Sequence, residues 1–253
     1  MDANVSRTAL VTGASRGLGF WLAWELARRG WSVALMARGR AALEAAAADI
    51  QKAAAAGAEV IYEPGDVADE ASRLRLVKRV DERWGRLQLL VNNASQLGPT
   101  PLPPLAEFPV EALEPLFRTN VAAPLRFVQL CLPLLQAAGQ ALVVNVSSDA
   151  AVGGYPGWGG YGASKAALDL MSLTLAHELA GTGVQVLAVD PGDMDTDLHR
   201  LAVPDADPAD LASPRDMAVR LADLVQRRLA PAGTPDERWR ICLAAENGGE
   251  SRA

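Results

Sequence analysis

Cysteine and histidine are scarce in this sequence of 253 residues. Its two cysteines are Cys131 and Cys242, and its two histidines are His177 and His199. The cysteines lie far apart in apolar surroundings, so they form neither a disulfide framework nor a metal-binding spacing, and we expect buried thiols. Two isolated histidines do not make a metal site. The sequence therefore predicts no bound metal.

An excess of basic charge and long apolar runs are also lacking. The net charge is −6, the isoelectric point is near 5.0, and the basic residues are scattered. A nucleic-acid or anionic membrane surface needs a basic face. No uninterrupted apolar run approaches the ~18 residues that suggest a membrane span. No basic-then-apolar leader precedes the first apolar run at Thr8. We therefore expect a cytoplasmic protein that binds neither nucleic acid nor membranes.

Apolar residues are abundant, at 50% of the chain, so a large core can form. Strand-like apolar runs alternate with helical patterns, which predicts one α/β domain over residues 1–253. Strands are expected at 9–11, 32–37, 58–63, 87–91, 141–147, 184–189 and 239–243, and the main helices at 20–29, 40–56, 69–84, 110–138, 161–180 and 214–229. The Pro-rich segment 192–213 is expected to be a substrate lid, and 245–253 a flexible tail.

The first expected strand ends in a glycine-rich turn, with Gly13, Gly17 and Gly19 before the first helix. Glycines let a backbone turn tightly and approach a pyrophosphate, whose charge is received by the free N–H groups at a helix start. The spacing differs from the common G-x-G-x-x-G pattern. The position of the turn, at the first strand-to-helix junction, nevertheless predicts a dinucleotide site.

The end of the second expected strand bears on cofactor choice. Folds selective for NAD place an acidic residue about twenty positions beyond the glycines, where it binds the ribose 2′-hydroxyl. Here Ala37 occupies that place and Arg38 follows. A guanidinium suits a 2′-phosphate, and Arg16 in the glycine turn can add a second cation, so NADP(H) is favoured over NAD(H). The alternative is that either arginine is a solvated surface charge.

Tyr161 and Lys165 are four residues apart, so on a helix they share one face. A neighbouring ammonium favours the phenolate, which predicts a lowered pKa for Tyr161 and a usable general acid/base. Ser148 follows the apolar run 141–146, so its hydroxyl is expected at the carboxyl edge of the sheet. A tyrosine four residues before a lysine is common on helix surfaces, so the weight of this pattern comes from the motifs around it.

Taken together, these motifs resemble the short-chain dehydrogenase/reductase family over about residues 7–230. The matching motifs are Thr12-Gly13-x-x-x-Gly17-x-Gly19, Asn92-Asn93-Ala94, Asn120, Ser148, Tyr161-x-x-x-Lys165 and Pro191-Gly192. The resemblance implies a doubly wound domain of Rossmann type with seven mostly parallel strands, a nicotinamide cofactor, and hydride transfer to or from a carbonyl carbon.

The resemblance also implies roles for four catalytic residues. Tyr161 would be the proton donor and acceptor, and Ser148 would steady the substrate oxygen. Lys165 would lower the pKa of Tyr161 and bind the nicotinamide ribose, while Asn120 would anchor a water that links Lys165 to solvent. Asparagine is a poor helix-interior residue, so Asn120 also predicts a distorted turn in the helix 110–138.

The cofactor and substrate residues follow in the same way. The predicted cofactor set comprises Gly13, Ser15, Arg16, Gly17, Leu18, Gly19, Arg38, Asp66, Val67, Asn92, Ala94, Tyr161, Lys165, Pro191, Gly192, Met194 and Thr196. Within it, Arg38 would select the 2′-phosphate and Thr196 would hold the carboxamide. Substrate is expected to meet Ser148, Tyr155, Trp158 and Tyr161, with Leu97 and the lid 194–203 completing the wall. These aromatics suggest an apolar or aromatic substrate, although they can equally be packing residues.

Two departures from the family pattern matter. Ser95 replaces the usual glycine after Asn-Asn-Ala, and we expect a shift in local packing from it. The Gly-rich C-terminal segment of the 3-oxoacyl carrier-protein reductases is missing around residues 239–247, which weakens a fatty-acid assignment. The loop 191–197 resembles that of sepiapterin reductases, which is thin support for a pterin substrate.

The sequence therefore predicts an NADPH-dependent reductase of ketones or aldehydes. Two alternatives are an NAD-linked alcohol dehydrogenase of the same family and a catalytically silent NADP-binding sensor, a role this fold also hosts. The complete set of four catalytic residues argues against the sensor. From the resemblance we expect a homodimer or homotetramer formed through the helices that contain Asn120 and Tyr161.

Overall fold

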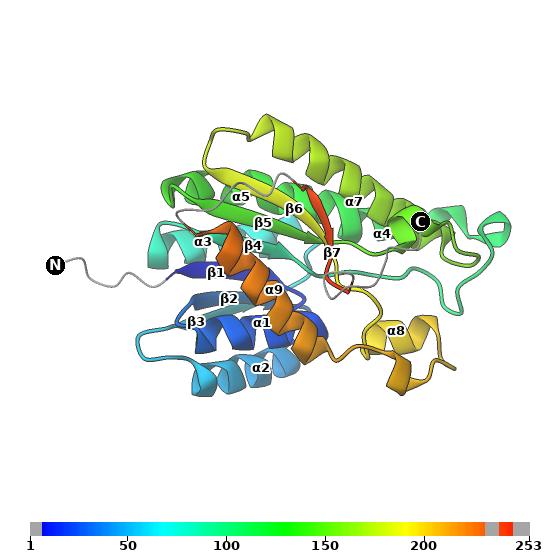
Figure 1. Ribbon diagram of the computed structural model, residues 1–253, viewed down its shortest axis with the longest axis horizontal. Helices are drawn as coiled ribbons and strands as arrows, with labels where there is room; N and C mark the ends of the chain where they lie inside the picture. Colours follow the sequence, from blue (N-terminus) through cyan, green and yellow to red (C-terminus); the bar gives the residue numbers. More distant parts are fainter. Residues whose placement is uncertain (1–6, 231–237, 245–253) are drawn as a thin grey trace.

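The computed structural model describes residues 7–230 and 238–244. Its centre is one seven-stranded parallel sheet in the order β3-β2-β1-β4-β5-β6-β7, flanked by helices (Figure 1). The strands are β1 (Thr8–Thr12), β2 (Ser32–Ala37), β3 (Val60–Pro64), β4 (Leu89–Asn92), β5 (Ala141–Val146), β6 (Val184–Asp190) and β7 (Arg240–Cys242). The predicted doubly wound fold is confirmed.

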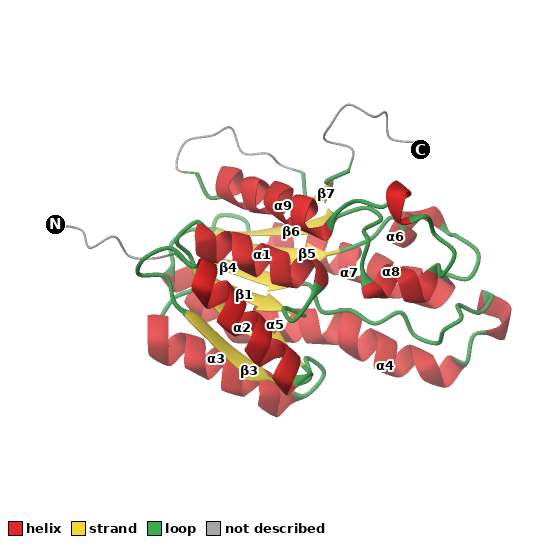
Figure 2. Ribbon diagram, turned by 90° about the horizontal axis from the view of Figure 1, so that it is seen from below, coloured by secondary structure: helices red, strands yellow, loops and turns green. Residues whose placement is uncertain are grey.

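Helices cover both faces of the sheet, which explains why the strands are apolar throughout instead of alternating. In β1, Ala9 and Val11 pack with α1 (Gly17–Arg28), α2 (Arg40–Ala53) and α9 (Pro214–Arg228). Leu10 points to the opposite face, where α3 (Glu70–Trp84) and α5 (Ala123–Ala137) pack. Figure 2 shows the sheet between these two layers. The remaining helices are α4 (Leu113–Phe117), α6 (Ala150–Gly153), α7 (Gly159–Glu178) and α8 (Asp197–Ala202).

The strand order reverses beside β1, which pairs with both β2 and β4. In open α/β sheets, ligands bind in the crevice outside the carboxyl ends of the strands at such a reversal. The glycine turn that follows β1 and the Asn-Asn-Ala segment at the end of β4 therefore meet at one edge of the sheet. Figure 1 shows α8 at this same edge.

The helix expected at 110–138 is interrupted. A π-helical turn, Arg118–Ala122, separates α4 from α5, and Asn120 lies within it. The distorted turn predicted from Asn120 is thus confirmed. The lid contains a helix that the sequence did not predict, α8, whose first turn is capped by Thr196: its Oγ1 accepts a hydrogen bond from His199 N at 3.3 Å. The predicted tail 245–253 lies outside the described residues.

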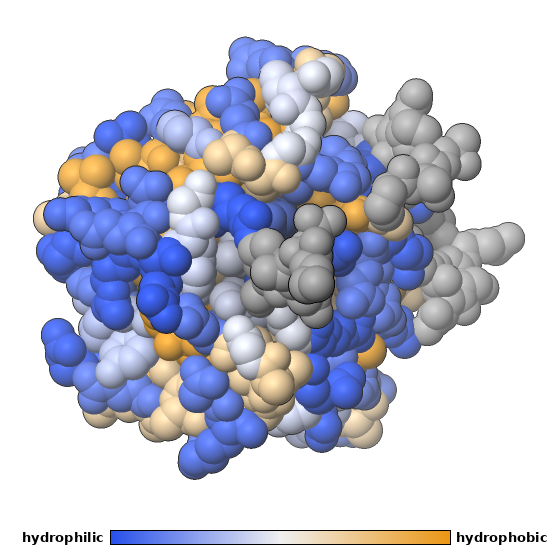
Figure 3. Space-filling model, turned by 90° about the vertical axis from the view of Figure 1, so that its left-hand side faces the viewer, coloured by the Kyte–Doolittle hydropathy of each residue, from blue (hydrophilic) through white to orange (hydrophobic). Residues whose placement is uncertain are grey.

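The surface of the molecule is mainly polar on the face drawn in Figure 3, where apolar side chains occur in small groups between hydrophilic ones. Within residues 7–230 and 238–244, no helix combines the length and apolar character that crossing a bilayer requires. In the same residues, no group of three or more histidine, cysteine or acidic side chains is arranged to hold a metal ion.

Candidate active site

An open cleft of about 450 Å³ lies at the carboxyl edge of the sheet, within the size range of small-molecule and cofactor sites. Its walls come from the ends of the six strands β1 to β6 and from α7 and α8. Most of the site residues predicted from the sequence line it: Gly13, Ser15, Arg16, Gly17, Leu18, Arg38, Asp66, Val67, Ala94, Ser148, Trp158, Tyr161, Lys165, Pro191, Gly192, Met194 and Thr196. Residues that are spread over 184 positions of the sequence thus line one cleft.

Four predicted residues lie outside the lining of this cleft in the described structure. Gly19 packs where a Cβ would come within 2.5 Å of Gly13 O, so its place is set by the tightness of the turn. Asn92 is buried, and its amide donates to Asn145 Oδ1 on the next strand at 2.8 Å. Asn120 is 1% exposed, and its proposed role stays a prediction. Tyr155 is 45% exposed and faces a shallow separate depression beside Leu105.

The glycine turn is joined directly to the end of β4. Gly13 has a φ of 66° and an added Cβ would lie 3.0 Å from Ala94 Cα, so only glycine fits there. Thr12 Oγ1 accepts hydrogen bonds from the backbone N–H groups of Asn93 and Ala94, at 3.0 and 3.1 Å. Asn93 Nδ2 in turn donates to Thr12 O at 2.9 Å. Asn93, which the sequence placed in the Asn-Asn-Ala motif but not in the predicted cofactor set, therefore fixes the turn and also lines the cleft.

The two cations near the predicted 2′-phosphate position differ in their partners. Arg38 is exposed on the cleft wall, and the residues that the structure describes give it no hydrogen-bond or ion-pair partner. Arg16 is paired with Asp197 of α8 at 2.9 Å, with both side chains largely exposed. Ala37, where an NAD-selective carboxylate would stand, is buried. Arg38 is thus the cation that an anionic group can engage without breaking an existing contact.

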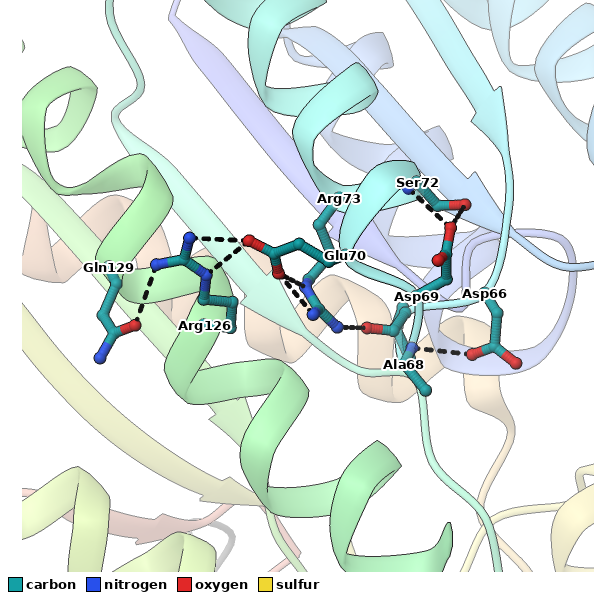
Figure 4. Close-up of polar contacts among 9 residues, drawn as sticks. Asp66, Ala68, Asp69, Glu70, Ser72, Arg73, Arg126 and Gln129 are labelled. Atoms are coloured by element: carbon teal, nitrogen blue, oxygen red, sulfur yellow. Dashed lines mark hydrogen bonds and ion pairs between the residues drawn. The ribbon is translucent and has the colours of Figure 1, made fainter.

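The loop that carries the predicted cofactor residues Asp66 and Val67 is held by the start of α3, as Figure 4 shows. Asp66 accepts a hydrogen bond from Ala68 N at 2.8 Å, and Arg73 donates to Val67 O. Asp69 caps the helix by accepting from Ser72 N at 2.8 Å. Glu70 bridges Arg73 and Arg126 of α5, and these guanidiniums lower the pKa of its carboxyl to about 2. The loop after β3 is therefore anchored to α3, whose first turn is in turn tied to α5.

Tyr161 and Lys165 lie side by side at the start of α7. The two side chains are 6% and 2% exposed, and Lys165 Nζ lies 5.5 Å from the centre of the Tyr161 ring. Lys165 Nζ donates to Val146 O at 2.7 Å, which ties the helix to the end of β5. The Trp158 ring meets that of Tyr161 edge-on, with centroids 5.7 Å apart. The phenol is thus enclosed between an ammonium and an aromatic wall.

Ser148 follows β5 and lines the same cleft. Its Oγ donates a hydrogen bond to Asp149 Oδ1 at 2.9 Å and accepts one from Ala150 N at 3.2 Å. Its carbonyl oxygen accepts from Arg240 of β7 at 3.0 Å. Arg240 also pairs with Asp169 of α7 at 2.8 Å. The loop that carries Ser148 is therefore held between α7 and the last strand.

The pKa of Tyr161 departs from the sequence prediction. Burial raises it to about 12, and nearby Asp190 acts in the same direction, while hydrogen bonds from Ser95 and Ser148 act against it. The sequence predicted that Lys165 lowers the pKa of Tyr161. This prediction is wrong for the protein by itself, because burial disfavours the charged forms of both groups. Burial likewise lowers the pKa of Lys165 to about 8. At neutral pH the phenol is protonated, which is the form that donates a proton.

The buried ammonium predicts a pH-dependent stability. The pKa of Lys165 falls from 10.5 to about 8 on folding, so the unfolded chain binds more protons between these values and stability rises with pH in this window. Between pH 7 and 9.5 this group should contribute a rise of about 2 kcal/mol. Urea unfolding of the wild type and of Lys165→Met measures this effect. As the pH rises from 7 to 9.5, the free energy of unfolding of the wild type should increase by about 2 kcal/mol relative to that of the variant. A constant difference across this range would contradict the burial of a charged lysine.

Sequence reasoning missed other residues of the cleft. Ser147 is 3% exposed, lines the cleft, and has an Oγ without a hydrogen-bond partner among the described residues. Asp190 lines the cleft, and burial raises the pKa of its carboxyl. Ser95 and Gln96 line it as well. A local signal for Ser95 existed, since it departs from the family pattern next to a predicted cofactor residue. The others depend on contacts between distant parts of the chain.

Comparison with known proteins agrees with this geometry. The family model described as short chain dehydrogenase matches residues 7–207. A ketoacyl reductase, HetN of Nostoc sp., is 32% identical over 76% of this chain, which spans 65% of that relative's length. The 3-oxoacyl-[acyl-carrier-protein] reductase FabG of Staphylococcus aureus is 32% identical over 77% of each chain. A structure of a short chain dehydrogenase from Shigella flexneri complexed with NADP has a TM-score of 0.84 and 27% identity, covering 94% of this chain and 97% of that one.

The chain belongs to the short-chain dehydrogenase/reductase family of oxidoreductases. The family uses nicotinamide cofactors. Members are thus expected to bind the dinucleotide across the carboxyl edge of the sheet, where the glycine turn, Arg38 and the Tyr161 region line one continuous cleft.

Proposed function

We propose that this protein reduces a ketone or aldehyde to an alcohol with NADPH, and that Tyr161 donates the proton. The observation that carries the proposal is a buried, protonated phenol beside Ser148 in the cleft that also contains the glycine turn and Arg38. The relatives named ketoacyl reductases support carbonyl reduction, and the NADP complex of the Shigella protein supports this cofactor.

The residues fit a dinucleotide on structural grounds. The backbone of the turn passes through positive φ values at Gly13 and Gly17, 66° and 57°, which leaves room for a pyrophosphate at the start of α1. Arg38 stands on the wall, and no described residue engages its guanidinium. When bound, the nicotinamide supplies the hydride. In this proposal Thr196, at the start of α8, holds the carboxamide.

The protein's own side chains orient the carbonyl and supply the proton. Ser148 steadies the substrate oxygen after its hydroxyl turns from Asp149, and Tyr161 donates its hydrogen to that oxygen as the alcohol forms. Lys165, charged at neutral pH, stabilises the phenolate that remains. The lysine's own bond to Val146 O keeps it in place during this step.

The wall next to Tyr161 favours an apolar or aromatic substrate. Leu97 and Ala150 pack with Tyr161, and Trp158 and Leu198 lie against the same cluster. Trp158 and Leu198 also line the cleft. Such a surface gains free energy by removing apolar substrate area from water, at about 25 cal/mol per Å². Association of copies through α5 and α7 stays a prediction of the family resemblance.

The test of the proposal is the reduction of a broad panel of carbonyl compounds by the purified protein, followed by the loss of NADPH absorbance. We expect aryl ketones and other apolar carbonyls to be reduced fastest, and NADPH to be used more efficiently than NADH. Failure to oxidise either cofactor with any member of the panel would contradict the proposal. Tight NADPH binding without turnover would favour the nucleotide sensor.

A further inference from the structure

Arg240 on β7 contacts three other elements of the fold. Its Nε donates to Asp169 Oδ2 of α7 at 2.8 Å, and its Nη2 donates at 3.0 Å to Ser148 O in the serine loop, residues 147–149 after β5. The same Nη2 lies 3.5 Å from Asp190 Oδ2 at the end of β6. The Arg240 side chain is 21% exposed, and both carboxylates are buried. One guanidinium thus joins the serine loop to a helix and to a strand.

The helix α7 is linked to the end of β5 at two places. Lys165 and Asp169 are four residues apart, so their side chains share one face of this helix. Lys165 Nζ donates directly to Val146 O at 2.7 Å. Asp169 reaches Ser148 O indirectly, through Arg240. The first link holds the end of the strand, and the second holds the loop that follows it.

Arg240 is a distant partner of Ser148. The Ser148 hydroxyl donates to Asp149 Oδ1 at 2.9 Å and accepts from Ala150 N at 3.2 Å, and its carbonyl oxygen also accepts from Ala151 N at 3.1 Å. These three bonds come from the next three residues, so they move with the loop. Arg240 lies 92 positions away in the sequence, so its bond fixes the loop relative to the sheet.

Two buried carboxylates hold the guanidinium in place. Asp169 and Asp190 are 5% and 4% exposed, and a buried charge needs a paired opposite charge. A guanidinium presents its donors in a fixed planar fork, whereas an ammonium is a point charge on a flexible stem. Arg240 can therefore meet both carboxylates and still direct a donor to Ser148 O. The direction of its side chain is thus set by charges that lie outside the serine loop.

We propose that Asp169 and Arg240 form a positioning pair, which sets the place of Ser148 relative to Tyr161. The inference rests on the reaction proposed above, in which Ser148 steadies the substrate oxygen and Tyr161 donates the proton. Asp169 orients the guanidinium, and Arg240 holds the carbonyl oxygen of Ser148. Neither residue of the pair is among the described residues that line the cleft or among the motifs of the family resemblance. A misplacement of about 1 Å in such a site can cost on the order of 10²-fold in rate.

The first test follows the serine loop without any substrate. The double variant Asp169→Leu and Arg240→Met removes both charges of the pair at once, so neither is left buried without the other. Two backbone N–H groups of α6 bond to Ser148, so amide hydrogen exchange of the segment 147–153 reports the opening of the loop. In the free protein, the double variant should accelerate this exchange about tenfold, the effect of losing a charge-assisted hydrogen bond.

Arg29→Met is the matched control. Arg29 is 15% exposed in its side chain and joins α1 to α9, since it pairs with Glu25 and Asp223 at 2.7 Å each. Its loss should lower the melting temperature and leave both kcat and the exchange of residues 147–153 unchanged. Arg240→Lys is a second, milder variant, which keeps a charge beside the buried carboxylates and loses the fork. It should fold even if the double variant does not, and should accelerate the exchange about threefold.

Steady-state kinetics tests whether the pair acts through Ser148. The double variant should lower kcat about tenfold, with the dissociation constant for NADPH within about twofold of the wild-type value. In a Ser148→Ala background, the same two substitutions should lower kcat by less than about twofold, because the hydroxyl that they place is already gone. An equal loss of kcat in both backgrounds would show that the pair acts apart from Ser148 and would overturn the proposal.

The exchange measurement separates this inference from the proposed reaction. Unchanged exchange of residues 147–153 in both variants of Arg240 would overturn the positioning pair, whatever the activity. An equal acceleration in Arg29→Met would assign the effect to a general loss of stability and would overturn it too. Accelerated exchange in a protein whose wild type reduces no carbonyl compound would instead contradict the proposed reaction and retain the link between Arg240 and Ser148.

Discussion

Replacing Tyr161 with phenylalanine is expected to lower kcat for carbonyl reduction by about 10²- to 10⁴-fold, the contribution typical of a positioned general acid. The substitution removes one oxygen and keeps the ring, which packs against Trp158 and lies 5.5 Å from Lys165 Nζ. The chemical step therefore loses its proton donor while the walls of the cleft keep their shape. The measurement is kcat from NADPH consumption with the best substrate of the panel.

Two controls separate chemistry from folding in this variant. The dissociation constant for NADPH, from fluorescence titration, should stay within a few-fold, because the phenol is not among the residues proposed to bind the phosphates. The melting temperature should change little, since the variant keeps the buried ring and its contact with Trp158. A variant that retains more than a tenth of wild-type kcat would exclude Tyr161 as the proton donor.

Replacing Arg38 with aspartate is expected to lower the preference for NADPH over NADH by at least about 100-fold. The change removes a charge-assisted bond to the 2′-phosphate, worth about 1.5–3 kcal/mol, and adds a carboxylate that repels this phosphate. The same carboxylate can accept hydrogen bonds from the ribose hydroxyls of NADH. The measurement is the ratio of kcat/KM for the two cofactors at a fixed carbonyl concentration.

Arg40→Asp is the matched control for this substitution. Arg40 lies two residues further on at the start of α2, is 71% exposed in its side chain, and pairs at 3.5 Å with Glu44. The substitution Arg40→Asp changes the net charge by the same amount as Arg38→Asp, but at a residue outside the lining of the cleft. An equal shift in cofactor preference for both variants would point to general electrostatics and would remove Arg38 as the selecting residue.

Local patterns predicted the fold and most of the cleft. Apolar runs identified the strands because a parallel sheet is buried on both faces. The glycine turn was recognisable because glycine is favoured where the backbone has a positive φ, as it does at Gly13 and Gly17. Asn120 was recognisable because an asparagine within a helix is typical of a distorted turn. Each of these signals lies within a few residues of sequence, which is why the sequence alone carries it.

The misses required contacts between distant segments. The pKa of Tyr161 has the opposite direction to the one predicted because burial depends on strands and loops far from α7. The helix α8 has six residues, too few to show a helical period. Tyr155 is a separate case and stays a prediction: it lies outside the lining of the cleft, while Trp158, three residues later, lines it.

The contact of Arg240 with Ser148 O joins the last strand, β7, to the candidate active site. Residue 240 lies beyond the segment 7–207 that the family model matches. Relatives that share every motif residue can therefore still differ in reactivity, since the orientation of the serine loop depends on a strand outside the motif-bearing part. Exchanging C-terminal segments between such relatives would test this dependence, with turnover as the readout.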